Sequence, residues 1–362
     1  MKVALVHDWL TGLRGGERVL EQLCLLYPDA DIFTLVHVPG SAGPIIERHR
    51  IAVSFLDRFP KRYYRNYLPL FPLAIESFDL KAYDLVLSTS HAVAKGVKAR
   101  LHISYIHTPM RYVWDQFEAY FGPGRSGFLT RTAARAVAPW LRSWDVRSTA
   151  RAHGLIANSK FVADRIRRFW SREADAVVYP PVDTARFAPA AEGPDTYALV
   201  VSALVPYKRV ELAVSAFSRL KRPLWIAGDG PELQKLRAMA GPSVRFLGAV
   251  PQDALPGLYA RARFFVLPGE EDFGIAPVEA QAAGRPVLAL GKGGALETVI
   301  ENETGVFFPE PTVASLLDGI ALIDKLQPDP TRIRAHAERF DARRFGPAIL
   351  GVVDRIRAMR RE

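Results

Sequence analysis

The stretch from Val266 to Gly284 constrains the fold more than any other part of the sequence. It follows an apolar run that the pattern predicts to be a buried strand. Pro277 suits the first turn of a helix, and Gly284 suits the position just after a helix end. The sequence therefore predicts a strand, then a loop over 268–276, then a helix of about two turns from 277 to 283.

The chemistry of this loop points to a particular kind of ligand. Its backbone N–H groups lie at a helix start, where Gly274 would let a phosphate come close. Two carboxylates bracket it, Glu271 on the loop and Glu279 in the helix. A sugar nucleotide fits this pattern, because its diphosphate lies between the ribose hydroxyls and the sugar hydroxyls. The two carboxylates can accept hydrogen bonds from these hydroxyls. A surface loop with solvated acids is the alternative.

The same stretch carries a family resemblance. The run Glu271-Asp-Phe-Gly-Ile-Ala-Pro-Val-Glu279, followed by Ala-Gln-Ala-Ala-Gly-Arg-Pro-Val287, resembles the signature of retaining glycosyltransferases of family 4. The resemblance implies an α/β protein of the GT-B fold, with two Rossmann-like domains facing across a cleft and a C-terminal helix crossing back to the N-terminal domain. It places Phe273, Gly274 and Ile275 at the donor, assigns Glu279 to the ribose hydroxyls and assigns Glu271 to the sugar hydroxyls.

The length of 362 residues exceeds one ordinary hydrophobic core, so two domains are expected. We predict an acceptor-binding domain over 1–182, a nucleotide-sugar-binding domain over 183–340 and the returning helix over 341–362. The Pro180-Pro181 pair and the polar run after it predict a linker near 181–196. The tail from Arg332 to Arg361 is predicted to be helical.

Composition limits the compartment and the class of partner. The single cysteine, Cys24, excludes an internal disulfide and a cysteine metal cluster, and we expect it to be buried. Asp8 interrupts the first apolar run too early for a signal peptide, and no stretch reaches the ~20 apolar residues that span a bilayer. We expect a cytoplasmic protein.

The net charge of +10 is unevenly distributed. Residues 1–180 hold 25 Lys or Arg and 16 Asp or Glu, a balance of +9, whereas the rest hold 23 and 22. A basic N-terminal half predicts an anionic surface or acceptor. No nucleic-acid module is recognisable, so nucleic acid is not an expected partner.

Two stretches of this half, 58–72 and 111–151, interleave aromatic residues with arginines such as Arg125 and Arg131. This pattern suits a membrane interface, where rings lie at headgroup depth and cations meet anionic lipid. Ordinary helices packed on the sheet, with arginines in water, explain the pattern as well.

The N-terminal domain begins with a buried strand over 2–7, a glycine-containing loop and a helix from about Glu17. The glycines do not form a dinucleotide fingerprint. By resemblance, Gly15 and Gly16 face the donor phosphates and the acceptor, whereas a tight turn is the alternative. His107 follows a predicted strand and maps onto the family histidine that approaches the donor sugar, although a lone histidine is often structural. His91 is a weaker acceptor-side candidate.

The second domain offers cations and further donor contacts. Lys208 and Arg209 stand at a helix start after a strand, where they can neutralise a diphosphate. The family usually carries a Gly-Arg pair ahead of this lysine, and this chain has Ser202-Ala203 there. Gly228 belongs to a turn that resembles a donor element of the family. Val250 follows a strand whose backbone would meet the base.

The resemblance also implies the reaction. A retaining transfer without metal or other cofactor is expected, from a nucleoside diphosphate sugar to an acceptor. The motifs around His107 and Lys208 look most like bacterial mannosyltransferases of surface-polysaccharide assembly. These use polyprenyl-diphosphate-linked acceptors at the inner face of the cytoplasmic membrane, and GDP-mannose is the first donor prediction. Another donor such as UDP-glucose, an epimerase, a phosphorylase and a non-catalytic sugar-nucleotide-binding protein are the alternatives.

Overall fold

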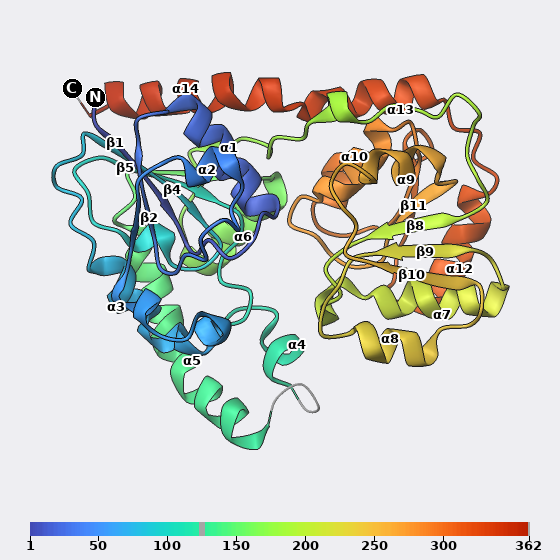
Figure 1. The fold of residues 1–362 in the computed structure, drawn as a ribbon, viewed down its shortest axis with the longest axis horizontal. Coiled ribbons are helices and arrows are strands. Elements are labelled where there is room, and N and C mark those ends of the chain that lie inside the picture. The colour runs from blue at the N-terminus through green and yellow to red at the C-terminus, as the bar shows by residue number, and fades with distance from the viewer. Residues whose placement is uncertain (123–126, 361–362) are drawn as a thin grey trace. The chain divides into compact units, whose positions relative to one another are not determined.

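The computed structural model describes residues 1–122 and 127–360, so Arg125 and Arg361 lie outside the described residues. The chain forms two compact α/β units (Figure 1). The first comprises Met1–Pro181 together with Arg343–Glu362, and the second comprises Val182–Ala342. The chain therefore passes between the units at 181–182 and again at 342–343, where the sequence placed its boundaries at 182–183 and 340–341.

The first unit is built on a seven-stranded parallel sheet in the order β3-β2-β1-β4-β5-β6-β7. Its strands are β1 (Val3–His7), β2 (Asp31–Thr34), β3 (Ile51–Val53), β4 (Leu85–Ser90), β5 (His102–Ile106), β6 (Gly154–Ala157) and β7 (Ala176–Val177). Its α-helices are α1 (Gly15–Leu26), α2 (Pro44–Glu47), α3 (Phe71–Glu76), α4 (Phe117–Phe121), α5 (Phe128–Thr149), α6 (Lys160–Trp170) and α14 (Ala342–Ala358). Short 3-10 helices are η1 (Phe55–Arg58), η2 (Lys61–Leu70) and η3 (Ala94–Gly96).

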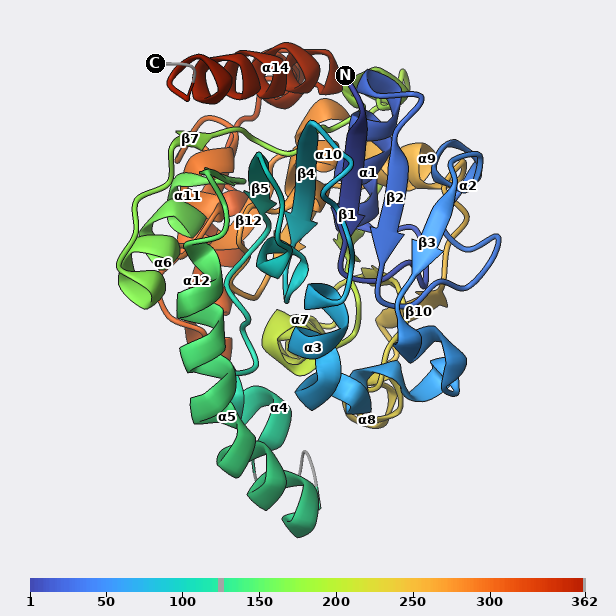
Figure 2. The same ribbon diagram turned by 90° about the vertical axis from the view of Figure 1, so that its left-hand side faces the viewer.

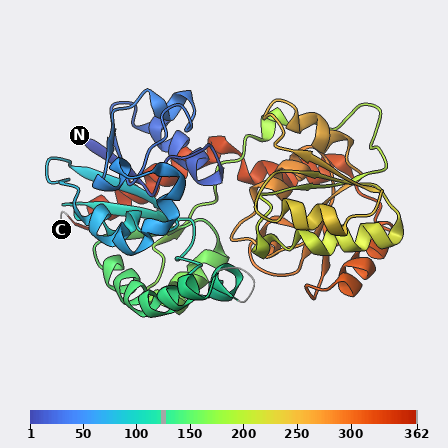
Figure 3. The same cartoon turned by 60° about the horizontal axis from the view of Figure 1, so that its bottom comes forward.

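Apolar side chains cover both faces of this sheet, as a parallel sheet requires. On one face α1 and α14 share a core that includes Leu20, Cys24 and Phe345. Figure 2 shows α14 beside the N-terminus and α1. On the other face α3 and α5 contribute Ile75 and Trp144. Figure 3 shows α5, in green, at the margin of the unit.

The second unit has a six-stranded parallel sheet in the order β10-β9-β8-β11-β12-β13. Its strands are β8 (Ala198–Val201), β9 (Leu224–Ala227), β10 (Val244–Gly248), β11 (Phe264–Leu267), β12 (Val287–Leu290) and β13 (Gly305–Phe308). Its α-helices are α7 (Val210–Leu220), α8 (Leu233–Met239), α9 (Leu255–Arg261), α10 (Ile275–Ala282), α11 (Ala295–Thr298), α12 (Val313–Ile323) and α13 (Pro330–Ala337), and its 3-10 helices are η4 (Thr184–Arg186), η5 (Pro206–Lys208) and η6 (Glu338–Phe340).

Three sequence-based boundaries need correction. Helix α1 begins at Gly15, so Gly15 and Gly16 form its first turn and are not in a loop. Helix α10 begins at Ile275, because Gly274 (φ 91°) is the N-cap and the first turn tolerates Pro277. The tail is two α-helices rather than one, since the chain is extended at Asp341, whose carboxylate accepts from the Thr184 hydroxyl.

The expected burial of Cys24 is confirmed. Ser159 caps α6 by accepting from the Val162 N–H at 3.0 Å. In the part of the chain that the structure describes, no helix combines the length and the apolar character needed to cross a bilayer.

Candidate functional site

In the second unit the strand order reverses between β8 and β11, and open parallel sheets bind ligands at the carboxyl ends of such strands. The segment after β8 carries Lys208, and the loop after β11 carries Glu271. The Lys208 ammonium donates to the Glu271 carboxylate, and these side chains are only 17% and 15% exposed. Two residues predicted to act together, far apart in sequence, are thus in direct contact.

Glycines allow the loops around this ion pair to pack backbone against backbone. A Cβ at Gly269 would lie 2.7 Å from the Lys208 carbonyl, and one at Gly294 would lie 2.5 Å from the Phe273 Cα. The Gly294 N–H donates to the Glu271 carbonyl at 2.8 Å. The loops after β8, β11 and β12 therefore form one tightly packed rim, in which the 291–297 loop reaches the Glu271 loop.

The N-terminus of α10 opens from the same rim. No side chain caps this helix and its first turn contains no acid. The first amides of a helix have no acceptor within it, so the N–H groups of Ile275 and Ala276 supply partial positive charge for an anion. The Phe273 ring is buried against Phe340, with 5.4 Å between ring centroids, so only the Phe273 backbone can meet a ligand.

Glu279 is held in place inside α10. Its carboxylate accepts from the Tyr259 hydroxyl at 2.7 Å. Burial, with the charge of Glu279 added, raises the pKa of Tyr259 well above its ordinary value, so this hydroxyl remains a donor. The contact with Tyr259 therefore orients the half-buried carboxylate, whose oxygens are hydrogen-bond acceptors.

No contact among the described residues brings three other predicted residues of this unit to the ion pair. Arg209, in the left-handed region at φ 52°, donates to Glu211 at 2.7 Å and to the Pro311 carbonyl at 3.2 Å. A Cβ at Gly228 would overlap the Ser202 carbonyl, 1.8 Å away, so this glycine serves the close approach of two strand ends. Val250 is half-buried just beyond β10.

The first unit has its own reversal in strand order, between β1 and β4, and Asp8 follows β1 there. Its fully buried carboxylate accepts four backbone N–H groups from residues 91–94 at 2.7 to 2.9 Å. The His91 Nδ1 lies 3.1 Å from the same carboxylate. Asp8 thus fixes the loop after β4.

The pKa values of Asp8 and His91 depend on each other. Burial acts to raise the pKa of Asp8, but the charges of His91 and His7 and the backbone N–H groups outweigh it, and the pKa lies below its ordinary value. Burial lowers the pKa of His91, against the opposing charge of Asp8. Asp8 is therefore ionised at neutral pH and His91 is biased towards its neutral form.

His107 completes the cluster at the end of β5. An added Cβ at Gly16 would lie 3.6 Å from the His107 Nε2 and 3.5 Å from the His7 Cε1. Burial and repulsion from His91 and His7 lower the pKa of His107 to about 3, so the imidazole is neutral. Its Nε2 is buried beside the first turn of α1 and has no hydrogen-bond partner among the described residues.

The sequence reading missed part of this cluster. His7 Nδ1 lies 2.6 Å from the Thr89 hydroxyl, and its Nε2 lies 3.9 Å from Glu17. Burial acts to raise the pKa of Glu17, but the neighbouring His7 lowers it overall. The available signal was the pair His7-Asp8 at the end of a buried strand, since polar residues there face the ligand edge of a parallel sheet.

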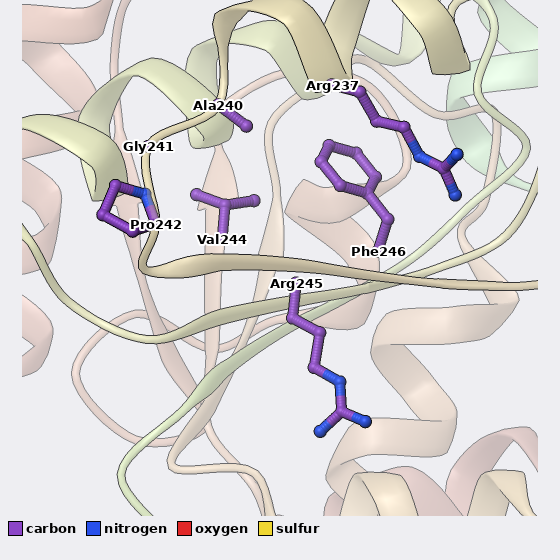
Figure 4. Close-up of a pocket in the computed structure, with 7 residues that line it drawn as sticks. All are labelled: Arg237, Ala240, Gly241, Pro242, Val244, Arg245 and Phe246. Atoms are coloured by element: carbon purple, nitrogen blue, oxygen red, sulfur yellow. The ribbon is translucent and has the colours of Figure 1, made fainter.

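A hollow of about 550 Å³ lies elsewhere, between α8 and the edge strand β10. Figure 4 shows its lining, which includes Arg237, Val244, Arg245 and Phe246. None of the predicted site residues lines it, and none of its lining residues is an acid. It is a shallow surface feature at the edge of the sheet, away from the strand-order reversal of this unit.

Two parallel doubly wound units of this kind define the GT-B architecture. HepE from Anabaena in complex with UDP superimposes with a TM-score of 0.72 at 18% identity, covering 98% of this chain and 100% of that one. The expected GT-B fold is confirmed. Residues 13–186 match Glycosyltransferase Family 4, and residues 181–340 match Glycosyl transferases group 1. Together the two matches span residues 13–340, so the chain carries one glycosyltransferase domain of each type.

Curated relatives agree with this assignment. A GDP-mannose-dependent alpha-(1-6)-phosphatidylinositol monomannoside mannosyltransferase of Mycobacterium tuberculosis is 35% identical over 199 residues, which are 46% of this chain and 52% of that protein. A D-inositol 3-phosphate glycosyltransferase of Streptomyces bingchenggensis is 31% identical over 230 residues, 52% of this chain and 50% of that protein. The matches therefore span about half the length of these relatives.

Proposed function

We propose that this chain is a retaining, metal-independent glycosyltransferase that moves mannose from GDP-mannose to a lipid-linked oligosaccharide or polysaccharide precursor. The observation that carries the proposal is the Lys208–Glu271 ion pair at the strand-order reversal, beside the uncapped start of α10. A cation, a row of amides and a carboxylate there match the charges and hydroxyls of a nucleoside diphosphate sugar.

Each donor group has a counterpart in the second unit. The α10 amides and Lys208 take the diphosphate, and both stabilise the negative charge that grows on the leaving group. Glu279, oriented by Tyr259, accepts from the ribose hydroxyls. Glu271 exchanges part of its contact with Lys208 for hydrogen bonds from the sugar hydroxyls, which orients the anomeric carbon.

The transfer breaks the bond between the anomeric carbon and the diphosphate oxygen and forms a bond from that carbon to an acceptor oxygen. The acceptor attacks from the face that the diphosphate leaves, so the configuration is retained. The acceptor proton passes to a donor phosphate oxygen, and the nucleoside diphosphate departs. Neutral His107 supplies a hydrogen bond through Nε2. Glu271 is not assigned as a nucleophile.

The identities of the donor and acceptor rest on different support. Mannose and guanine are supported by the 35% identical mannosyltransferase, whose name specifies GDP-mannose. A polyprenyl-diphosphate acceptor is supported by the balance of +9 in residues 1–180, which suits an anionic acceptor at the inner face of the cytoplasmic membrane. The protein would then be peripheral on that membrane.

A thermal-shift panel of UDP-, GDP- and ADP-sugars tests the donor directly. A ligand present at about a hundred times its dissociation constant adds ~2.7 kcal/mol to stability. GDP-mannose should give the largest shift. A larger shift with UDP-glucose would reassign the donor, and no shift with any sugar nucleotide would refute the proposal.

Turnover separates the remaining classes. A transferase releases GDP only when an acceptor is present and yields an α-configured product, which NMR of the product identifies. An epimerase would convert the sugar nucleotide without acceptor. A binding protein would show the thermal shift without transfer to any acceptor tested.

A further inference from the structure

Helix α5 of the first unit has two halves in different surroundings. Its C-terminal half is anchored by Asp145, which is fully buried and pairs with the buried Lys95 at 2.5 Å. The other carboxylate oxygen of Asp145 accepts from the indole N–H groups of Trp114 and Trp170, each at 2.7 Å. This network fixes α5 against η3 and α6.

The N-terminal half has no comparable support. No residue from 128 to 137 is buried. Phe128 is 80% exposed and Leu129 is 82% exposed, the largest values for bulky apolar side chains in the described part of the chain. Figures 1 and 2 show this half of α5 extending away from the sheet. Large exposed apolar groups at the end of a projecting helix indicate a site that binds another surface.

The outward face of the helix is apolar over several turns. At about 100° per residue, the same side carries Phe128, Leu129, Thr132, Ala133, Ala136 and Trp140, all exposed. Trp140 is 43% exposed. No charged residue lies on this side between Phe128 and Trp140.

Arginines flank this face. Arg131 and Arg135 lie along one margin, and Arg135 is 3.5 Å from Glu118 of α4, with both side chains exposed to solvent. Asp145 is the one acid of α5, and it is paired with Lys95 in the buried network. An apolar face with arginines beside it and no exposed acid on α5 itself matches the boundary between lipid headgroups and acyl chains, where an indole ring also sits favourably.

Another pair of elements, α3 and the η2 ahead of it, lies beside the C-terminal half of α5. Figures 1 and 2 place α3 beside α5, and the Trp144 indole N–H donates to Glu76 of α3 at 2.6 Å. Leu73 of α3 is 60% exposed, and η2 ahead of it contributes Lys61, Arg62 and Arg65. Cations and apolar groups are thus repeated next to α5.

We propose that the outward face of α5, from Phe128 to Trp140, binds an anionic lipid bilayer, with Phe128 and Leu129 inserted below the headgroups. The inference rests on the membrane part of the proposed function and not on the donor chemistry. The basic balance of the first unit selects anionic lipid as the occupant over a neutral partner.

The test is sedimentation of the full chain with vesicles of phosphatidylcholine, alone or mixed with phosphatidylglycerol. The wild type should bind the mixed vesicles and bind neutral ones weakly. Phe128→Gln with Leu129→Gln should lower the partition coefficient about tenfold or more, because two large apolar side chains are no longer buried. Arg131→Gln should lower it by a few fold, only with phosphatidylglycerol.

The matched control replaces two exposed leucines that lie outside this surface, Leu322→Gln with Leu350→Gln. It should bind vesicles as the wild type does. Because Phe128 and Leu129 contact little else, their double variant should keep the wild-type melting temperature and the thermal shift with GDP-mannose. If GDP-mannose gave no thermal shift with the wild type, the donor assignment would be refuted. The vesicle measurement would still test the membrane proposal, because it does not depend on the donor.

Two results would overturn the inference. One is equal vesicle binding by the wild type and the Phe128→Gln, Leu129→Gln variant. The other is a wild type that binds no anionic vesicles but forms a dimer that the same double substitution dissociates, which would assign the face to a second copy of this chain.

Discussion

Gly16→Ala separates folding from function at the first strand-order reversal. Gly16 is the second residue of α1, and alanine is the better residue within a helix, by about 0.5–1 kcal/mol. The added Cβ would lie 3.5 Å from the His7 Cε1 and 3.6 Å from the His107 Nε2, which are ordinary contact distances. The fold should therefore accept the methyl group and gain up to about 1 kcal/mol, or a few degrees in melting temperature.

The same methyl group should harm catalysis. An oxygen that accepts from or donates to the His107 Nε2 lies about 2.9 Å from it. The added Cβ at position 16 lies 3.6 Å from Nε2. An oxygen bound to Nε2 on the side that faces Gly16 would therefore overlap this carbon. A ligand displaced by about 1 Å can lose ~10²-fold in rate, so we expect that loss in kcat/KM.

The assay is initial-rate transfer from GDP-mannose, with melting temperature measured on the same preparations. Gly351→Ala is the control, because Gly351 also lies within a helix, α14, and an added Cβ there meets nothing within 4 Å. It should gain stability and keep wild-type kcat/KM. A Gly16→Ala enzyme that is stabilised and fully active would refute the placement of a ligand beside His107.

Three further substitutions test separate parts of the account. Glu271→Ala should lower kcat by about 10²-fold with little change in donor affinity, since its contacts orient the sugar; full activity in a folded variant would remove Glu271 from the mechanism. Glu279→Ala should weaken GDP binding ten- to a hundredfold in calorimetry, the effect of losing a charged acceptor worth about 1.5–3 kcal/mol; an unchanged Kd would reassign the ribose site. Asp8→Asn should cost about 3 kcal/mol of unfolding free energy at neutral pH, because the buried N–H groups of 91–94 lose a charged acceptor. The folded pKa of Asp8 is lowered, so its contribution is present above the unfolded pKa of about 3.9 and is lost as pH falls through the folded pKa. Urea unfolding should thus show the two proteins converging in acid, and a pH-independent difference would contradict this reasoning.

The sequence predicted the strand before the Glu271 loop and the position of that loop, because both leave local traces. Buried strands such as 264–267 are apolar runs, and the Glu271 loop carries its acids and glycines at fixed spacing. The Ser159 cap was likewise predictable, because a capping side chain acts within three residues. The sequence placed the starts of α1 and α10 two residues late. A glycine such as Gly15 or Gly274 is equally compatible with a loop and with the beginning of a helix.

What could not be predicted depends on contacts between distant segments. Asp8 meets residues 91–94 only because β1 and β4 are neighbours in the sheet, and nothing near Asp8 in sequence indicates this. Arg209 was grouped with Lys208 by adjacency, yet its left-handed backbone directs it to Glu211 and Pro311. The break at Asp341 likewise reflects a partner, Thr184, that is remote in sequence.

The most direct test of the central claim is a crystal structure of the protein with bound GDP. The account predicts diphosphate oxygens within hydrogen-bond distance of the Ile275 and Ala276 amides, with the Lys208 ammonium close by and the ribose hydroxyls on Glu279. A nucleotide bound at another place, with α10 and the Lys208–Glu271 pair left without ligand contacts, would contradict it.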